Sequence, residues 1–218
     1  MSTWTSKVRR AGLAALAAGL LPGCMADLGL PFPLAAPAAS PAAEPEPPVL
    51  GGAVAVAAPA GWCADPRSGL AGDAGDFLLL GPCRGAAAPP APVILTVSVL
   101  GAAEAGDVAP ERMEGFFRSE VGRAALSRSG DPASVTILQT GIAGDGYFLH
   151  VRDTAEMAGA PVAPEAWRAV LPLSGRLVAL TALSPAEPRV PPATLRAVLD
   201  AFVARMRAAN APVGAGAG

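Results

Sequence analysis

The segment PVILTVSVL, residues 92–100, decides the fold class of this 218-residue chain. Thr96 and Ser98 alternate with apolar residues that all fall on the other side of an extended chain, namely Val93, Leu95, Val97 and Val99. A period of two is typical of a strand with one face against a core and the other face wetter. The segment therefore predicts a sheet with one buried face.

Further strands are expected on either side, because short apolar or alternating runs are bounded by glycine and proline at residues 54–56, 77–80, 134–140, 145–152, 165–173 and 176–184. The run 77–80 is apolar throughout, which predicts burial on both faces. Gly141–Gly144 and Ser174-Gly175 are interpreted as hairpin links. Pro172 has no ladder donor, so its strand is predicted to be an edge or to be bulged there.

Two segments have a helical period of about 3.6. Residues 110–126 are predicted to form one helix with an apolar stripe made of Met113, Phe116, Phe117, Val121 and Ala124. A terminal helix is predicted to begin at Pro191-Pro192, with an apolar stripe made of Leu195, Val198, Leu199, Phe202, Val203 and Met206. Together these elements predict one α+β domain over residues 49–210, with helices packed on a mostly antiparallel sheet, followed by a disordered tail at 211–218.

The first 23 residues have the parts of a secretory signal peptide. A cationic start contains Lys7, Arg9 and Arg10, and an apolar run follows at residues 11–21. A transmembrane helix needs about 20 apolar residues, and this run is near half that length. We therefore expect residues 1–23 to be cleaved.

The end of this signal, Leu21-Pro22-Gly23-Cys24, resembles the lipobox of bacterial lipoproteins. That resemblance implies cleavage before Cys24, diacylation of its thiol and acylation of the new amine. Met25 follows instead of the Asp that commonly retains lipoproteins at the inner membrane, which implies the outer membrane, facing the periplasm. The alternative is ordinary cleavage after Ala26, which would discard Cys24. Residues 24–48 are rich in proline and alanine and are predicted to be a disordered tether.

Charge argues against a nucleic-acid surface. From Cys24 onward the chain holds 13 Lys and Arg against 18 Asp and Glu, a net charge of −5. A net negative surface disfavours nucleic acid and anionic lipid as partners. The expected membrane contact is therefore the N-terminal lipid.

The two remaining cysteines, Cys63 and Cys83, are predicted to form a disulfide, because an exported chain folds where thiols oxidise. A zinc site is the alternative, but zinc takes three or four ligands and His150 is the only histidine. A redox pair would show Cys-x-x-Cys spacing, which is absent here.

The order of these elements resembles the PsbP-like fold, shared by photosystem accessory proteins, a Ran-binding protein and many small bacterial lipoproteins. The turn Pro59-x-Gly61-Trp62 is the local signature, and the resemblance covers about residues 50–209. It implies a non-catalytic accessory or binding module and supplies no set of functional residues. Cys63 and Cys83 are not part of any pattern associated with that fold.

No catalytic or cofactor motif stands out. Gly141–Gly146 has the order Gly-x-x-Gly-x-Gly between two strands, which indicates a turn and not a dinucleotide loop. Asp73 and Asp76 could meet a calcium ion, although a solvated loop is the simpler interpretation. No cofactor and no metal site is predicted.

Two functions are compatible with these observations. The first is a lipid-anchored cell-envelope accessory protein without its own catalysis, binding an envelope protein or a small ligand through a face near Trp62, with Asp65, Tyr147 and His150 as candidates. The second is an envelope hydrolase whose site is not evident in the sequence. Convergence of Asp65, Tyr147 or His150 in one deep pocket would favour the hydrolase.

Lipidation of Cys24 gives a direct prediction. Mass spectrometry of the mature protein is expected to find an N-terminal Cys24 that carries acyl chains. Attachment of more than one acyl chain anchors a protein to the membrane effectively permanently. A Cys24→Ser variant of the full chain should be released from the membrane fraction. An unmodified mature chain that begins at Asp27 would contradict the prediction.

Overall fold

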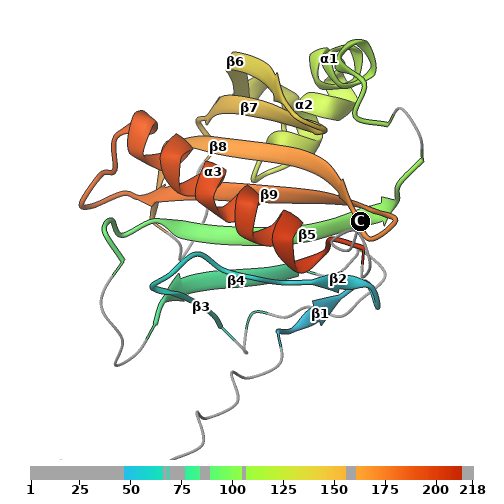
Figure 1. Cartoon of the computed structure of the whole chain (residues 1–218). Helices are drawn as coiled ribbons and strands as arrows, with labels where there is room; N and C mark the ends of the chain where they lie inside the picture. The colour runs from blue at the N-terminus through green and yellow to red at the C-terminus, as the bar shows by residue number, and fades with distance from the viewer. Residues whose placement is uncertain are drawn as a thin grey trace, which may run out of the picture. The chain divides into compact units, whose positions relative to one another are not determined.

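Seven strands form one antiparallel sheet in the computed structural model of the chain: β3 (Trp62–Ala64), β4 (Phe77–Pro82), β5 (Ile94–Ala102), β6 (Val135–Ala143), β7 (Gly146–Asp153), β8 (Val162–Leu173) and β9 (Arg176–Pro185). Their order across the sheet is β3-β4-β5-β9-β8-β7-β6 (Figure 1). A separate ribbon pairs β1 (Val49–Leu50) with β2 (Val54–Ala55). The helices are α1 (Pro110–Arg118), α2 (Glu120–Leu126) and α3 (Pro192–Ala209). The predicted α+β class is confirmed.

The structure describes residues 47–65, 68, 77–83, 89–104, 107–155 and 161–212, all within one compact unit. The signal peptide, Cys24, most of the tether, Asp73, Asp76 and residues 213–218 lie outside this part of the chain. Among the helices described, none is long and apolar enough to cross a bilayer.

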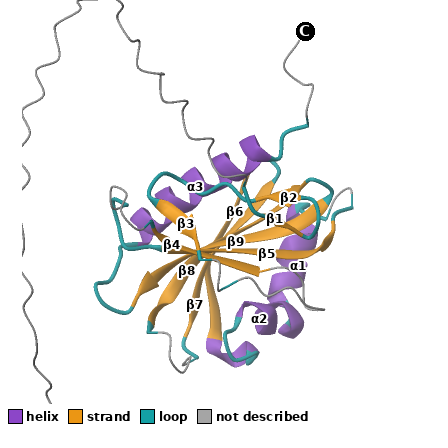
Figure 2. Cartoon of the chain, turned by 90° about the horizontal axis from the view of Figure 1, so that it is seen from below, coloured by secondary structure: helices purple, strands orange, loops and turns teal. Residues whose placement is uncertain are grey.

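The helix α3 covers one face of the sheet (Figure 2). The alternation in β5 is confirmed, because Val93, Leu95, Val97 and Val99 are all at most 5% exposed and belong to the core that α3 completes. All six residues of the predicted α3 stripe are buried in the same core. This face is therefore closed by apolar packing, which is the main stabilising term of a domain.

Asn210 fixes the end of α3 to the rest of the fold. Its Nδ2 donates to the carbonyl of Ala55 at 2.8 Å, and its Oδ1 accepts from the Ala55 amide at 2.9 Å. The hydroxyl of Ser174 lies 2.9 Å from the same Oδ1. One side chain thus joins α3, β2 and the turn between β8 and β9.

The predicted helix over residues 110–126 is two helices. Ser119 adopts extended backbone angles (φ −70°, ψ 161°), and its hydroxyl accepts from the amide of Gly122 at 3.0 Å, which caps α2. Gly122 sits so close to α1 that an added Cβ would overlap the carbonyl oxygen of Phe116. Because the break changes the helical phase, Phe116 and Val121 are 40% and 71% exposed, not buried as the single stripe predicted.

Strand β4 corrects a second prediction. Leu78 and Leu80 are buried against the α3 side, but Phe77 and Leu79 on the other face are only partly buried. The second face of the sheet has no helix over this strand, since α1 and α2 cover the opposite end (Figure 2). Residues 77–80 are therefore buried on one face and not on two.

Both predicted hairpins form. Ser174 and Gly175 have φ of 48° and 71°, the left-handed geometry of a two-residue turn between β8 and β9. The link between β6 and β7 is shorter than predicted, because β6 runs on to Ala143.

Pro172 lies neither in an edge strand of the sheet nor at a bulge, but its strand is locally unpaired on one side, as an edge is. Strand β8 lies inside the sheet, and Pro172 pairs in regular register with Leu177 of β9. The pairing with β7 ends at Val170, so no neighbouring strand on that side requires an amide donor from Pro172.

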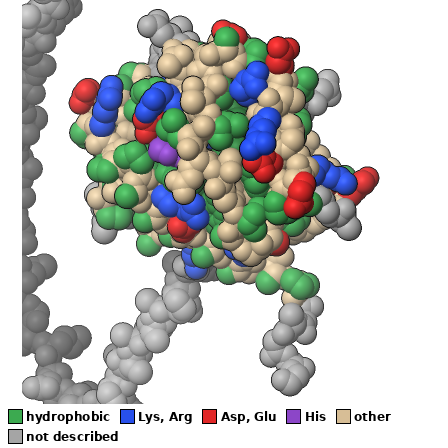
Figure 3. All heavy atoms as spheres, turned by 90° about the horizontal axis from the view of Figure 1, so that it is seen from above, with side chains coloured by type: hydrophobic (Ala, Val, Ile, Leu, Met, Phe, Trp, Pro, Cys, Tyr) green, Lys and Arg blue, Asp and Glu red, His purple; other side chains and the backbone are tan. Residues whose placement is uncertain are grey.

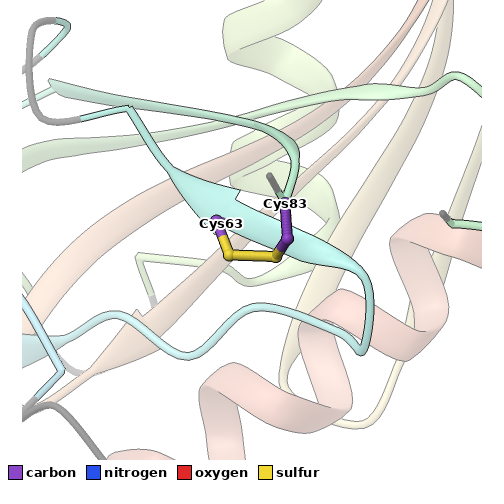
Figure 4. The surroundings of a disulfide bond; sticks show 2 residues. All are labelled: Cys63 and Cys83. Atoms are coloured by element: carbon purple, nitrogen blue, oxygen red, sulfur yellow. A yellow bond between two sulfur atoms is a disulfide. The ribbon is translucent and has the colours of Figure 1, made fainter. Parts of the chain in front are cut away.

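A disulfide joins Cys63 in β3 to Cys83 just after β4 (Figure 4). Beside it, the amide of Cys83 donates to the carbonyl of Gly61 at 2.9 Å. The indole of neighbouring Trp62 is 5% exposed and donates to the carbonyl of Val93 at 2.7 Å. The predicted covalent link therefore holds the Trp62 turn to the end of β4.

Removal of this disulfide is expected to destabilise the domain. The cysteines are 20 residues apart, and closing such a loop contributes about 3 kcal/mol in the chain-entropy model. The double variant Cys63→Ser, Cys83→Ser should melt on the order of 6–12 °C lower than the wild type. Reduction of the wild-type protein should produce the same shift, measured by circular dichroism. An unchanged melting curve after reduction would show that the bond does not stabilise the fold.

Candidate ligand cavity on the second face of the sheet

Two adjoining hollows lie on the face of the sheet that α3 does not cover. The larger has a volume of about 570 Å³ and lies between α1, α2 and the strands β5, β7, β8 and β9. The smaller, of about 350 Å³, lies over β4, β5, β8 and β9. Ser98, Arg168 and Thr181 line both hollows, so the two meet at these three residues.

The larger hollow has an apolar lining. Met113 and Phe117 from α1 face Leu149 and Val170 from the sheet, and all four belong to a second core cluster. Ala179 contributes only a methyl group, which leaves space above β9. Apolar surface in a hollow of this size is the usual property of a small-molecule site.

Exposed apolar side chains occur in the same lining. Leu100 is 57% exposed and Phe116 is 40% exposed, and both line the larger hollow. The ring of Phe116 lies edge-on to Phe117, with centroids 5.0 Å apart.

A buried ion pair closes one end of the smaller hollow. The side chains of Arg128 and Asp153 are 11% and 4% exposed, and Nε of Arg128 lies 3.5 Å from Oδ2 of Asp153. Asp153 also accepts from the Arg128 amide at 2.7 Å, the Ser134 hydroxyl at 2.7 Å and the Ala155 amide at 3.0 Å. Arg128 in turn donates to the carbonyl of Ala163 at 2.9 Å.

These contacts set the pKa of Asp153. Burial alone would raise it, but the amides of Arg128 and Ala155, the hydroxyl of Ser134 and the charge of Arg128 outweigh burial. The pKa of Asp153 is therefore below its ordinary value of 3.8. This carboxylate is charged and fully occupied by protein donors at neutral pH.

Arg168 lies where the two hollows meet. Its Nη2 donates to the carbonyl of Leu126, at the end of α2, at 2.8 Å. Its Nε is buried with no hydrogen-bond partner. Burial lowers the pKa of Arg168 to about 10, with Asp153 raising it and Arg128 lowering it. The guanidinium is therefore still charged at neutral pH.

The four residues predicted for a binding face do not lie together. Trp62 is in the core beneath α3, and Asp65 follows the short strand β3 at one edge of the sheet. Tyr147 and His150 lie in β7 near the other edge and point to opposite faces. None of the four lines either hollow.

His150 belongs to a surface cluster on the α3 side of the sheet. Its ring stacks on Trp167 with centroids 4.8 Å apart, and Nε2 lies 3.2 Å from Oε2 of Glu165. Glu165 accepts from Arg152 at 2.6 Å, which is the first cause of the lowered pKa of Glu165. In the described part of the chain, no hydrogen bond links His150 to a serine, threonine or cysteine.

Charges elsewhere are mixed in sign. The surface seen in Figure 3 carries basic and acidic side chains interspersed, and not gathered by sign. Within the ranges that the structure describes, no three side chains of His, Cys, Asp or Glu gather closely enough to hold a metal ion.

The sequence interpretation missed the hollows and Arg168. One signal was available, because Arg168 is a lone charge inside the apolar run of residues 166–170. A cation in a strand of that kind either has a buried partner or faces a cavity. The partner strands that decide between these two cases are far away in the sequence.

Acid should weaken the fold through Asp153. Because its folded pKa lies below the unfolded value, its stabilising contribution is complete above 3.8 and is lost as the pH falls through the folded pKa. Asp153→Asn should lower the free energy of unfolding at neutral pH by on the order of 3 kcal/mol, since it breaks a buried pair. Its urea-unfolding midpoint should then change less with acidification than that of the wild type. Asp200→Asn, at an exposed pair with Arg196, is the control and should keep the wild-type acid slope.

Comparison with known proteins finds no family model, no curated protein and no solved structure that matches this chain.

Proposed function

We propose that this chain is a lipid-anchored cell-envelope protein that binds a small apolar molecule in the larger hollow and carries out no catalysis of its own. The observation that carries the proposal is an apolar hollow of about 570 Å³ between α1, α2 and the sheet. The lipobox ending in Cys24 supports the anchor, and Met25 supports the periplasmic side of the outer membrane. A PsbP-like domain of the non-catalytic kind is compatible with the antiparallel sheet and its helices.

The shape of the site favours a small ligand over a protein partner. Small-molecule pockets have volumes of about 300–1,000 Å³ and bury most of the ligand surface. The larger hollow lies within this range and is lined on one side by α1 and α2. Leu100 and Phe116 supply exposed apolar surface in the same lining.

The alternative, an envelope hydrolase, has less support from the geometry. Such an enzyme needs a base beside a nucleophile or a metal. His150 pairs with Glu165 and Trp167 on the other face of the sheet, away from both hollows. Asp65, Tyr147 and His150 do not converge, which was the condition for favouring catalysis.

Filling the hollow should abolish binding. The uncharged fluorescent probe N-phenylnaphthylamine is expected to bind the wild-type domain with a fluorescence increase that saturates at one probe per chain. Ala179→Phe places a ring in the space above β9 and should weaken binding by at least about tenfold.

Ala204→Phe is the matched control, because the same residue is added at an exposed position of α3 on the other face. It should bind the probe like the wild type. Absence of saturable binding to the wild type, or equal binding by a correctly folded Ala179→Phe variant, would show that the hollow is not a ligand site.

A further inference from the structure

Among the residues that the structure describes, one cation in the lining of the two hollows forms no ion pair. Their charged lining residues are Arg112, Arg128, Arg168, Asp107 and Asp153. Arg112 pairs with Asp107 at 2.8 Å, and Arg128 pairs with Asp153 at 3.5 Å. Among the described residues, no carboxylate lies within ion-pair distance of Arg168. The lining therefore has one excess positive charge, and Arg168 carries it.

The hydrogen bonds of Arg168 are also incomplete. A guanidinium has five N–H donors in a planar fork. Arg168 uses one nitrogen, Nη2, for the carbonyl of Leu126, and Nε is buried without a partner. No described residue accepts a hydrogen bond from Nη1. Nε is fully buried, whereas Nη1 is not. Arg168 lines both hollows, and Nη1 therefore remains the donor that a bound molecule could use.

If Arg168 had a purely structural role, its unpaired charge would reduce the stability of the fold. A cation near the last carbonyls of a helix is favourable, and the bond to Leu126 at the end of α2 is of this kind. However, Arg168 is partly buried, and removing a charge from water without a counter-ion is unfavourable. Burial is the first cause of the lowered pKa of Arg168. A leucine or methionine would pack against the apolar lining without this cost.

The surroundings of Arg168 describe the missing partner. Ser98 and Thr181 lie with it where the two hollows meet, so hydroxyl groups accompany the cation. The larger hollow extends from this point as an apolar space under α1, past Met113 and Phe117. A molecule that satisfies both parts has one anionic group and one apolar body.

Building on the proposed function, we propose that the ligand is an amphiphile whose single anionic group, a carboxylate or a phosphate, pairs with Arg168 while its apolar tail occupies the larger hollow. The guanidinium fork matches either oxyanion with two parallel hydrogen bonds. A free fatty acid and a single-chain phospholipid both have this chemistry.

The first test compares ligands with the same tail on the wild-type domain. Dodecanoate, dodecyl phosphate and dodecanol are titrated at neutral pH, below their aggregation concentrations, to displace N-phenylnaphthylamine. At least one anion should displace the probe about tenfold better than the alcohol, the contribution of a charge-assisted bond. The tighter of the two anions identifies whether the source is a carboxylate or a phosphate.

The second test changes the cation. Arg168→Gln should lose the preference for the anion while its affinity for dodecanol stays unchanged, and Arg168→Lys should retain part of the preference. Arg118→Gln is the control, since Arg118 is a cation of α1 that pairs with Glu114 and lines neither hollow. This control should keep the wild-type preference.

The outcomes separate the two proposals. Equal displacement by dodecanol and both anions would overturn the role of Arg168 and leave the apolar site intact. A preference that Arg118→Gln removes as fully as Arg168→Gln would also overturn it. Failure of the probe itself to bind would overturn the proposed function. The wild-type comparison of anion and alcohol decides the question even if Arg168→Gln does not fold.

Discussion

A seven-stranded sheet has two faces, and this chain provides one long helix. Helix α3 spans Pro192–Ala209 and buries six side chains against one face, where Asn210 fastens its end to Ala55 and Ser174. The other face receives only α1 and α2, which are short and change direction at Ser119. Unequal cover of the two faces leaves the hollows, and the candidate site depends on it.

The buried charges on the second face have two different environments. Asp153 is enclosed by Arg128, Ser134 and Ala155, so both of its carboxylate oxygens already accept from protein donors. Arg168 lies in the same region and is partly buried, and within the described part of the chain it makes one hydrogen bond and no ion pair. The Arg128–Asp153 pair, with its hydrogen bonds complete, stabilises the local structure. Arg168, whose hydrogen bonds are incomplete, indicates which groups a bound molecule would supply.

Periodicity was sufficient to locate the strands β4 to β9 and the helix α3, because alternation and 3.6-residue spacing report burial directly, but it gave no signal for the short strands β1 and β3. It failed at residues 110–126, where Ser119 interrupts an apolar stripe that reads as continuous. It also failed at Phe77 and Leu79, since apolar residues that line a hollow look like core residues in a sequence. Trp62 and Tyr147 were candidates for a binding face, yet both are core residues. The position of Arg168 depends on long-range strand pairing, which single-sequence patterns do not contain.

An open sheet has two edge strands whose free backbone groups can pair with another chain and begin aggregation. At one edge, β3 is only three residues long, and the disulfide holds it to the adjoining strand. At the other edge, β6 is longer and carries the exposed side chains of Leu138 and Ile142, but its register with β7 shifts between Ile137 and Gln139. Such an irregularity interrupts the ladder that an incoming strand would need. The cross-link and the shift therefore protect this β-rich domain, at the two edges of its sheet, against templated self-association.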